Sequence, residues 1–369
     1  MLILKATPRI AMLVSFSGQG GVEKMMTHLA HGLIELGVQL DLLLIRKDSP
    51  YVANLPEKAR FIDFKHRHAV SALPEVIRYL NKEQPNALLA AKNRANLVAI
   101  LAKRLAGVKT RVVARMGTTT SVAIAQKPWP ARMAWRIPMK LLYPMADAVV
   151  AVSDGVAKDM ACMTGLNRQK IHVLPNPVIT PDLIILSKEK PTHPWLIKKD
   201  SPVITAVGRL TEQKDFATLL HAFALARKEK ALKLVIFGEG QQRAKLESLA
   251  CDLGVAQDVA LPGFTTNPYR EVGASDLFVL SSRWEGSPNA LTEALALGIP
   301  VVATDCPSGP REILGQMGNL VPVGDPESLA QAILATLTNP PSKAMLQQTA
   351  APYTLQQSAQ SYLQVLLGI

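Results

Sequence analysis

Short apolar runs alternate with helical patterns along most of the 369 residues, and this alternation limits the possible folds more than any other feature. It predicts parallel sheets covered by helices on both faces. Seven runs of the first half are expected to be strands: 10–16, 38–45, 59–64, 86–91, 111–116, 148–153 and 171–176. Six runs of the second half repeat the scheme: 203–208, 232–238, 259–264, 277–282, 300–304 and 319–323. The sequence therefore predicts two doubly wound α/β domains.

The chain is longer than one ordinary hydrophobic core needs, which also favours two domains. We expect a first domain over residues 1–178, a linker over 179–201, a second domain over 202–350 and a C-terminal helix over 351–369. The linker is expected to lack regular elements because the stretch from Pro175 to Pro202 contains six prolines, counting both ends. One possible arrangement is that the C-terminal helix packs back on the first domain. Function is expected in the loops at the carboxyl ends of strands, which would line a cleft between the domains.

Charge is distributed unevenly along the chain. The formal net charge is +12, and residues 1–175 carry 25 Lys and Arg against 11 Asp and Glu. A half this basic is expected to attract a membrane surface, a nucleic acid or a phosphorylated substrate. The alternative is that its charges simply form a solvated face. Trp129, Trp135 and Tyr143 lie among Lys and Arg, a composition typical of membrane-surface segments. The prolines of that segment argue against one continuous helix.

Composition excludes several classes of protein. Three widely spaced cysteines argue against a disulfide framework and favour a reducing, cytoplasmic compartment. No segment has the pattern of a signal peptide or of a membrane-spanning helix, so a soluble or peripheral protein is expected. The seven histidines lack Cys or carboxylate partners at metal-ligand spacing, so we expect no metal site. No nucleic-acid recognition module is evident.

Two strand-to-helix loops carry groups that suit an anionic ligand. A glycine cluster ending in Gly20 and Gly21 follows the first strand, where backbone amides could approach a phosphate or a sugar. This cluster fits neither a Walker A loop nor a dinucleotide-binding pattern, and a tight structural turn explains it equally well. Gly208, Arg209 and Lys214 follow the first strand of the second domain. Two cations beside a glycine can neutralise a diphosphate.

Two glutamates, Glu285 and Glu293, lie on either side of a predicted helix start. Ser287 suits the N-cap and Pro288 the first helical position, and apolar residues recur at helical spacing until Gly298. The N-terminus of this helix is expected to face a phosphate-bearing ligand. Two other glutamate pairs have the same separation, so the spacing alone does not identify a site. The prediction rests on the position of Glu285 and Glu293 around the helix start.

These loops, in this order, resemble the retaining GT-B glycosyltransferases of the GT4 family over essentially the whole chain. The resemblance rests on GQGGVE, ADAVVAVSDGVAKDM, KIHVLPNPV, VGRLTEQK, FGEG and EGSPNALTEALALGIPVVATD. It implies two Rossmann-like domains facing each other across a cleft, with the acceptor bound by the first domain. It also implies a nucleotide-diphosphate sugar donor, with UDP the expected nucleotide and a hexose or N-acetylhexosamine the expected sugar, and no metal or other cofactor.

The segment CPSGPREIL resembles bacterial enzymes that build surface polysaccharides or lipid-linked oligosaccharides. That likeness implies a glycan or lipid-linked acceptor, met by a peripheral protein at the inner face of the cytoplasmic membrane. The basic N-terminal half agrees with an anionic membrane surface as partner.

The family pattern also assigns roles by position. Arg209 and Lys214 would hold the donor diphosphate, Glu285 the sugar and Glu293 the ribose hydroxyls, and the first three are expected to be catalytic. The resemblance implies further donor contacts, of which Gly263 and Phe264 would lie beside the base. They are Gly20, Gly21, Gly208, Gly263, Phe264, Gly286, Ser287, Asn289, Ala290 and Leu291.

One position departs from the family pattern. Many members have a His at the carboxyl end of a middle strand of the N-terminal domain, whereas the corresponding run here is VVARMGTTTSV. Arg115 or Thr118 is expected to occupy that space on the acceptor side. The departure also fits a front-face mechanism, in which the acceptor hydroxyl attacks on the side that the diphosphate leaves.

Two alternatives use the same residues. A nucleotide-sugar 2-epimerase of the GT-B class would use the donor cleft without an acceptor, and would leave the basic half unexplained. A basic protein that binds an anionic polymer would use the N-terminal half, but would need a recognition module. A nicotinamide-dependent oxidoreductase is excluded by the glycine pattern, which lacks the third glycine of the dinucleotide motif.

Overall fold

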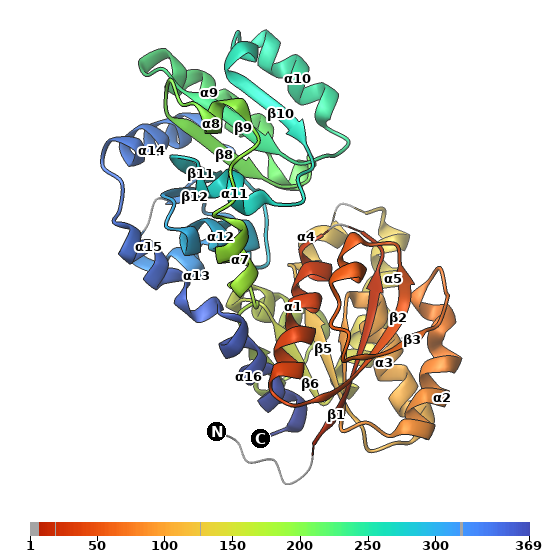
Figure 1. The fold of residues 1–369 in the computed structure, drawn as a ribbon. Helices are drawn as coiled ribbons and strands as arrows, with labels where there is room; N and C mark the ends of the chain where they lie inside the picture. The colour runs from red at the N-terminus through yellow and green to blue at the C-terminus, as the bar shows by residue number, and fades with distance from the viewer. Residues whose placement is uncertain (1–6, 19, 126, 318–319) are drawn as a thin grey trace. The chain divides into compact units, whose positions relative to one another are not determined.

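The computed structural model describes residues 7–18, 20–125, 127–317 and 320–369, which form two compact units (Figure 1). The first unit consists of the described residues through Val178 together with Tyr353–Ile369, and the second is Ile179–Pro352. The opening residues 1–6 and the first residue of the run expected at 319–323 lie outside the described ranges. Each unit is built on a parallel sheet, so the predicted doubly wound α/β architecture is confirmed.

The first unit contains, among its described residues, a seven-stranded sheet in the order β3-β2-β1-β4-β5-β6-β7. The strands are β1 (Arg9–Phe16), β2 (Gln39–Lys47), β3 (Arg60–Asp63), β4 (Ala87–Ala91), β5 (Arg111–Met116), β6 (Ala148–Ala151) and β7 (Ile171–Val173). The helices are α1 (Gly21–Glu35), α2 (Leu73–Glu83), α3 (Asn93–Ala106), α4 (Thr120–Ala125), α5 (Trp129–Leu142), α6 (Asp154–Thr164) and α16 (Leu355–Leu367). Winding reverses between β1 and β4, so the carboxyl ends of these two strands form a switch point.

Burial on both faces explains why the central strands of this sheet are continuously apolar. Alternate residues of a strand point to opposite faces. Ala11 and Leu13 pack into a core shared with α2, α3, α5 and α6, whereas Ile10 and Met12 pack into a second core shared with α1 and α16. Figure 1 shows α16 lying alongside α1, although the two helices are far apart in the sequence.

The second unit contains, in its described part, a six-stranded parallel sheet in the order β10-β9-β8-β11-β12-β13. The strands are β8 (Val203–Val207), β9 (Lys233–Phe237), β10 (Val259–Gly263), β11 (Leu277–Leu280), β12 (Val301–Thr304) and β13 (Leu320–Val321). The helices are α7 (Pro181–Leu186), α8 (Pro194–Ile197), α9 (Phe216–Glu229), α10 (Arg243–Asp252), α11 (Pro268–Gly273), α12 (Asn289–Leu297), α13 (Pro310–Leu314), α14 (Pro326–Thr338) and α15 (Lys343–Ala350). Its switch point lies between β8 and β11.

One expectation drawn from prolines is wrong, and another holds only in part. The segment 179–201 contains the short helices α7 and α8, because Pro181 and Pro194 each stand at a helix start, where the missing N–H costs nothing. Helix α5 runs through Pro138, since one proline removes one internal hydrogen bond but need not end a helix, whereas it ends at Leu142, before Pro144. Within the described ranges, none of the helices combines the length and the apolar content that crossing a bilayer requires.

We predict that Gly32→Ala in α1 destabilises the protein. A Cβ at Gly32 would lie 2.7 Å from the Cβ of Ala359 and 2.9 Å from Cδ1 of Leu355, so α16 would have to move away. The expected loss is about 1–3 kcal/mol, although adding a Cβ in a helix interior usually stabilises it. Thermal unfolding measures the effect, and adding Ala359→Gly should restore part of it. A higher melting temperature for Gly32→Ala alone would contradict the close packing.

Candidate active site

The loop after β8 lies against the loop after β9. The Gly208 amide donates to the Phe237 carbonyl over 3.0 Å. Any side chain at Gly238 would overlap the Gly208 carbonyl oxygen, so glycine is required for this approach. The loop ends in a 3₁₀ turn over Glu212–Lys214, and the stem of Lys214 runs over Gly208, where an added Cβ would lie 3.1 Å from Lys214 Cε. The glycine therefore makes room for the lysine.

The loop after β11 brings Glu285 to this lysine. Lys214 Nζ donates to Glu285 Oε1 over 2.5 Å, and Ser282 Oγ donates to the same oxygen over 2.6 Å. Ser281 Oγ donates to the Lys214 carbonyl over 2.8 Å. Only 8% of the Glu285 side chain and 16% of the Lys214 side chain are exposed, so the ion pair is largely shielded from water. The structure thus brings these two predicted site residues together at the switch point between β8 and β11.

The other residues predicted to contact the donor lie on several loops. Arg209 is exposed in the loop after β8. Gly263 ends β10, and its carbonyl accepts from the Gly238 amide over 2.8 Å. The next residue, Phe264, is 45% exposed, which is unusual for a large aromatic ring in a folded unit. Gly20 and Gly21 belong to the first unit.

Helix α12 begins one residue later than predicted. Pro288 has an extended backbone, with φ −72° and ψ 99°, and its carbonyl accepts from the amides of Leu291 and Thr292. These features make Pro288 the N-cap, so the prediction of Ser287 as N-cap and Pro288 as the first helical residue is wrong. The Ser287 hydroxyl is instead buried and has no hydrogen-bond partner among the described residues.

The rest of α12 follows the prediction. Gly298 ends it in the left-handed conformation at φ +75°. The predicted contacts Asn289, Ala290 and Leu291 form its first turn, and Glu293 lies buried just beyond them. Glu285 and Glu293 therefore lie before and after the first turn of this helix, as predicted from the sequence.

Cys306 lies near the ion pair but is not a nucleophile. Burial, and then the negative charge of Glu285, raise the pKa of the Cys306 thiol to about 12. The thiol is therefore protonated at neutral pH, and a protonated thiol attacks poorly.

A second Lys–Glu pair lies at the switch point of the first unit, and the sequence analysis missed it. Gly20 is the N-cap of α1, and Glu23 in the first turn is buried. Lys92 directly follows β4, and its Nζ donates to Glu23 Oε1 over 2.6 Å and to the Ser15 carbonyl over 2.7 Å. The backbone of Lys92 has φ +74°, a costly conformation that is often found at functional sites. A charged residue directly after a buried strand was the signal that could have found it.

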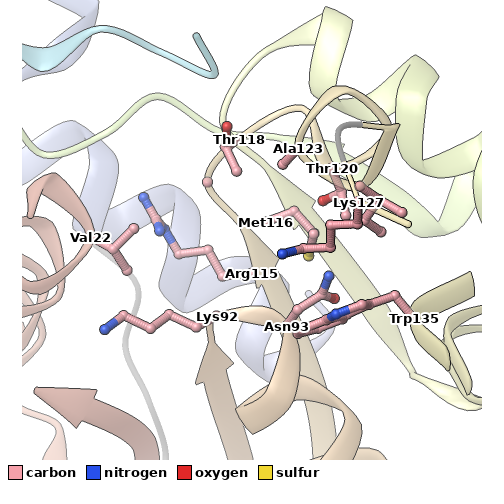
Figure 2. A pocket seen from close by; sticks show the side chains of 12 residues that line it. Val22, Lys92, Asn93, Arg115, Met116, Thr118, Thr120, Ala123, Lys127 and Trp135 are labelled. Carbon is pink, nitrogen blue, oxygen red and sulfur yellow. The ribbon is translucent and has the colours of Figure 1, made fainter. Parts of the chain in front are cut away.

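Arg115 and Thr118 both line a cavity of about 240 Å³ in the first unit (Figure 2). In Figure 2, Val22, Lys92 and the Arg115 guanidinium lie on one side of the view, and Lys127 and Trp135 on the other. Arg115 is 2% exposed, whereas Thr118 is exposed. The sequence therefore selected two residues of a real pocket, at the carboxyl end of β5.

Both partners of the Arg115 guanidinium come from elsewhere in the chain. Its Nε donates to the Tyr362 hydroxyl over 3.0 Å, and its Nη2 donates to Asn176 Oδ1 over 2.6 Å. Tyr362 lies on α16, 247 residues further along. No local sequence pattern could have indicated that contact.

Two family models together match most of the chain. Glycosyltransferase Family 4 matches residues 19–180, and Glycosyl transferases group 1 matches residues 187–352. The solved structure of a glycosyltransferase from Rickettsia africae has a TM-score of 0.80 at 16% identity and covers 98% of each chain. Anabaena HepE in complex with UDP-glucose has a TM-score of 0.79 at 17% identity and covers 98% of this chain and 100% of that one. At these identities the structures establish the fold.

Curated relatives are similar in sequence as well. The chain is 34% identical over 247 residues to the N-acetylgalactosamine-N,N'-diacetylbacillosaminyl-diphospho-undecaprenol 4-alpha-N-acetylgalactosaminyltransferase of Campylobacter jejuni, covering 66% of this chain and 65% of that protein. It is 37% identical over 177 residues to the uncharacterized glycosyltransferase MJ1059 of Methanocaldococcus jannaschii, covering 47% of this chain and 44% of that protein. It is 28% identical over 324 residues to the lipopolysaccharide core biosynthesis glycosyltransferase LpsE of Rhizobium meliloti, covering 86% of each.

The chain therefore belongs to the GT4-type glycosyltransferases, and its two units have the GT-B fold. The family resemblance and the fold predicted from the sequence are confirmed. The roles of individual site residues remain predictions.

We predict that the Lys214–Glu285 pair is coupled in stability. Lys214→Met leaves a shielded carboxylate without its cation, at an expected cost of about 1–3 kcal/mol. The double variant Lys214→Met/Glu285→Gln should unfold at a higher temperature than Lys214→Met alone, because the unpaired charge is gone. Arg283→Met is the control, since Arg283 is 46% exposed in its pair with Asp215 and should matter less. Additive losses in the double variant would show that the pair is not coupled.

Proposed function

We propose that the protein is a retaining hexosyl- or N-acetylhexosaminyltransferase that uses a UDP-sugar donor and a lipid-linked glycan acceptor in bacterial cell-surface glycan synthesis. The Lys214–Glu285 pair at the carboxyl edge of the second sheet carries the proposal. Family membership limits the chemistry to glycosyl transfer. The donor is supported by the UDP-glucose complex of HepE, and the acceptor by the name of the Campylobacter relative, which specifies a diphospho-undecaprenol substrate.

The donor side follows from the charge that develops in the reaction. Breaking the bond between sugar and diphosphate leaves negative charge on the phosphate, which a fixed cation stabilises. The ammonium of Lys214 would supply that charge, held in place by Glu285, and the exposed guanidinium of Arg209 could clamp a second phosphate oxygen. With two cations in this role, we propose that the reaction needs no metal ion. The exposed ring of Phe264 offers a surface for the base.

The two glutamates would serve the sugar and the ribose. Glu285, held by Lys214 and Ser282, is proposed to contact a donor-sugar hydroxyl. Glu293 is proposed to accept from ribose hydroxyls. The acceptor is assigned to the cavity of the first unit, beside Arg115 and Thr118. We propose front-face attack by the acceptor hydroxyl as the route to retention.

We predict that Lys214→Ala and Glu285→Ala each lower the release of UDP from a UDP-sugar by about 100-fold or more, because each removes a preorganised charge contact. UDP should raise the melting temperature of the wild type, since a ligand of the folded state stabilises it. Arg283→Ala, a change of similar size in the same loop, is the control, and EDTA should leave all rates unchanged. Wild-type turnover in either site variant would contradict the site. A protein stabilised by neither UDP, GDP nor ADP would contradict the donor class.

Helix α5 is the surface of the first unit that best suits a membrane. Its exposed large apolar residues and those that follow it are 42–66% exposed: Trp129, Ile137, Leu141 and Met145. Residues 127–146 contain four Lys and Arg and no Asp or Glu. Exposed apolar side chains among cations favour binding to an anionic lipid surface, where a lipid-linked acceptor would be met. We therefore propose a peripheral protein at the inner face of the cytoplasmic membrane.

We predict that Arg136→Glu/Lys140→Glu lowers binding to phosphatidylglycerol vesicles in a flotation assay at low salt. The reversal replaces attraction by repulsion, and each cation near an anionic surface contributes about 1 kcal/mol. Arg104→Glu/Lys109→Glu is the matched control, because it makes the same charge change at exposed positions of the same unit that are not part of α5. If the two double variants lost vesicle binding equally, the loss would be due to the change in net charge and not to α5. A wild type that ignores the vesicles would contradict membrane binding.

A further inference from the structure

Arg115 is a buried cation whose charge is compensated by none of the described residues of its unit. The residue is 2% exposed, and both groups that accept from it, the Tyr362 hydroxyl and the Asn176 side-chain oxygen, are neutral. In the part of the chain that the structure describes, its guanidinium makes no ion pair. Its Nη1 is buried and has no hydrogen-bond partner among the described residues. A buried guanidinium in this state is costly unless a ligand completes it.

The unpartnered nitrogen belongs to a side chain that lines a cavity. Arg115 is one of the residues that line the cavity of the first unit. A Cβ on Gly117 would lie 3.2 Å from Arg115 Nη1 and 3.4 Å from a methyl group of Val22. The absence of a side chain at Gly117 therefore leaves space directly beside the free N–H group.

The remaining lining of the cavity favours an anionic group attached to something apolar or ring-shaped. Lys92 and Lys127 add two cations, and no Asp or Glu is among the described residues that line the space. Lys92 is already paired with Glu23, and Lys127 is exposed, so Arg115 is the buried cation of the lining that makes no ion pair among the described residues. Ile124 and Trp135 add apolar surface to the lining. At about 240 Å³ the cavity is smaller than the roughly 300–1,000 Å³ of sites for drug-sized ligands, so it suits a phosphate group or one ring.

We infer that this cavity binds a phosphate group of the acceptor, with Arg115 as the residue that contacts it and Tyr362 of α16 as the residue that positions Arg115. This inference rests on the proposed transfer to an acceptor and adds the chemical class of that acceptor, a phosphorylated or diphosphate-linked one. A guanidinium held by two neutral acceptors keeps its full charge for the ligand, and its fixed plane matches the oxygens of a phosphate.

The test compares two anions on the full-length protein by isothermal titration. Farnesyl diphosphate, an isoprenoid diphosphate, serves as the acceptor-side probe and farnesol as its uncharged counterpart, whereas UDP probes the donor side. Arg115→Met should weaken farnesyl diphosphate binding about 10- to 100-fold, the usual effect of losing a hydrogen bond to a charged group, and leave the Kd of UDP unchanged. Arg115→Lys should retain part of the binding. Tyr362→Phe should weaken it about 2- to 10-fold.

Arg111→Met is the matched control. Arg111 lies on the same strand and donates from Nε to the Val365 carbonyl of α16, but it does not line the cavity. It should therefore leave both affinities unchanged. Equal binding of farnesyl diphosphate by the wild type and Arg115→Met, or equal binding of farnesol and its diphosphate, would overturn the inference. A loss of UDP binding in Arg115→Met would also overturn the inference, because Arg115 would then contact the donor. Failure of the wild type to bind UDP would instead contradict the proposed function.

Discussion

Burial of parallel strands on both faces is the constraint on which the rest of this protein depends. Ile10 and Leu13 of the same strand pack into different cores, so both faces of the first sheet are covered. The charged groups of the candidate sites lie at the edges where strands end. The two switch points, between β1 and β4 and between β8 and β11, gather such groups, and each holds a Lys–Glu pair, Lys92–Glu23 or Lys214–Glu285.

The cations of the two units differ in how they are compensated. Lys214 is paired with a shielded carboxylate that also accepts from Ser282, so the pair is neutral and its geometry is fixed before any ligand binds. Among the described residues, the guanidinium of Arg115 has only neutral hydrogen-bond partners. Pairing fixes the position of the Lys214 ammonium, whereas the guanidinium of Arg115 is held by neutral groups. Both arrangements rest on burial, because water would otherwise screen them.

The C-terminal helix, α16, contributes both to the packing of the first unit and to the position of Arg115 at the cavity. Ala359 packs against Gly32 of α1, and Tyr362 accepts from Arg115 at the carboxyl end of β5. The same helix therefore fills the core on one face of the sheet and fixes a polar group at the edge of the cavity. A substitution in α16 can therefore alter the site through its packing on α1 or through the Tyr362–Arg115 hydrogen bond.

The sequence by itself determined the two parallel sheets, the order of their strands along the chain, the loops that hold Lys214 and Glu285, and Gly298 as the end of α12. Local periodicity and glycine chemistry encode these features, so they can be read without a structure. The partners of Lys214 and Arg115 and the Lys92–Glu23 pair were decided by tertiary structure. Each depends on residues that meet only after folding: Tyr362 lies 247 residues from Arg115, and Lys92 lies 69 from Glu23. Spacing along the chain holds no record of such contacts, because burial and strand order create them.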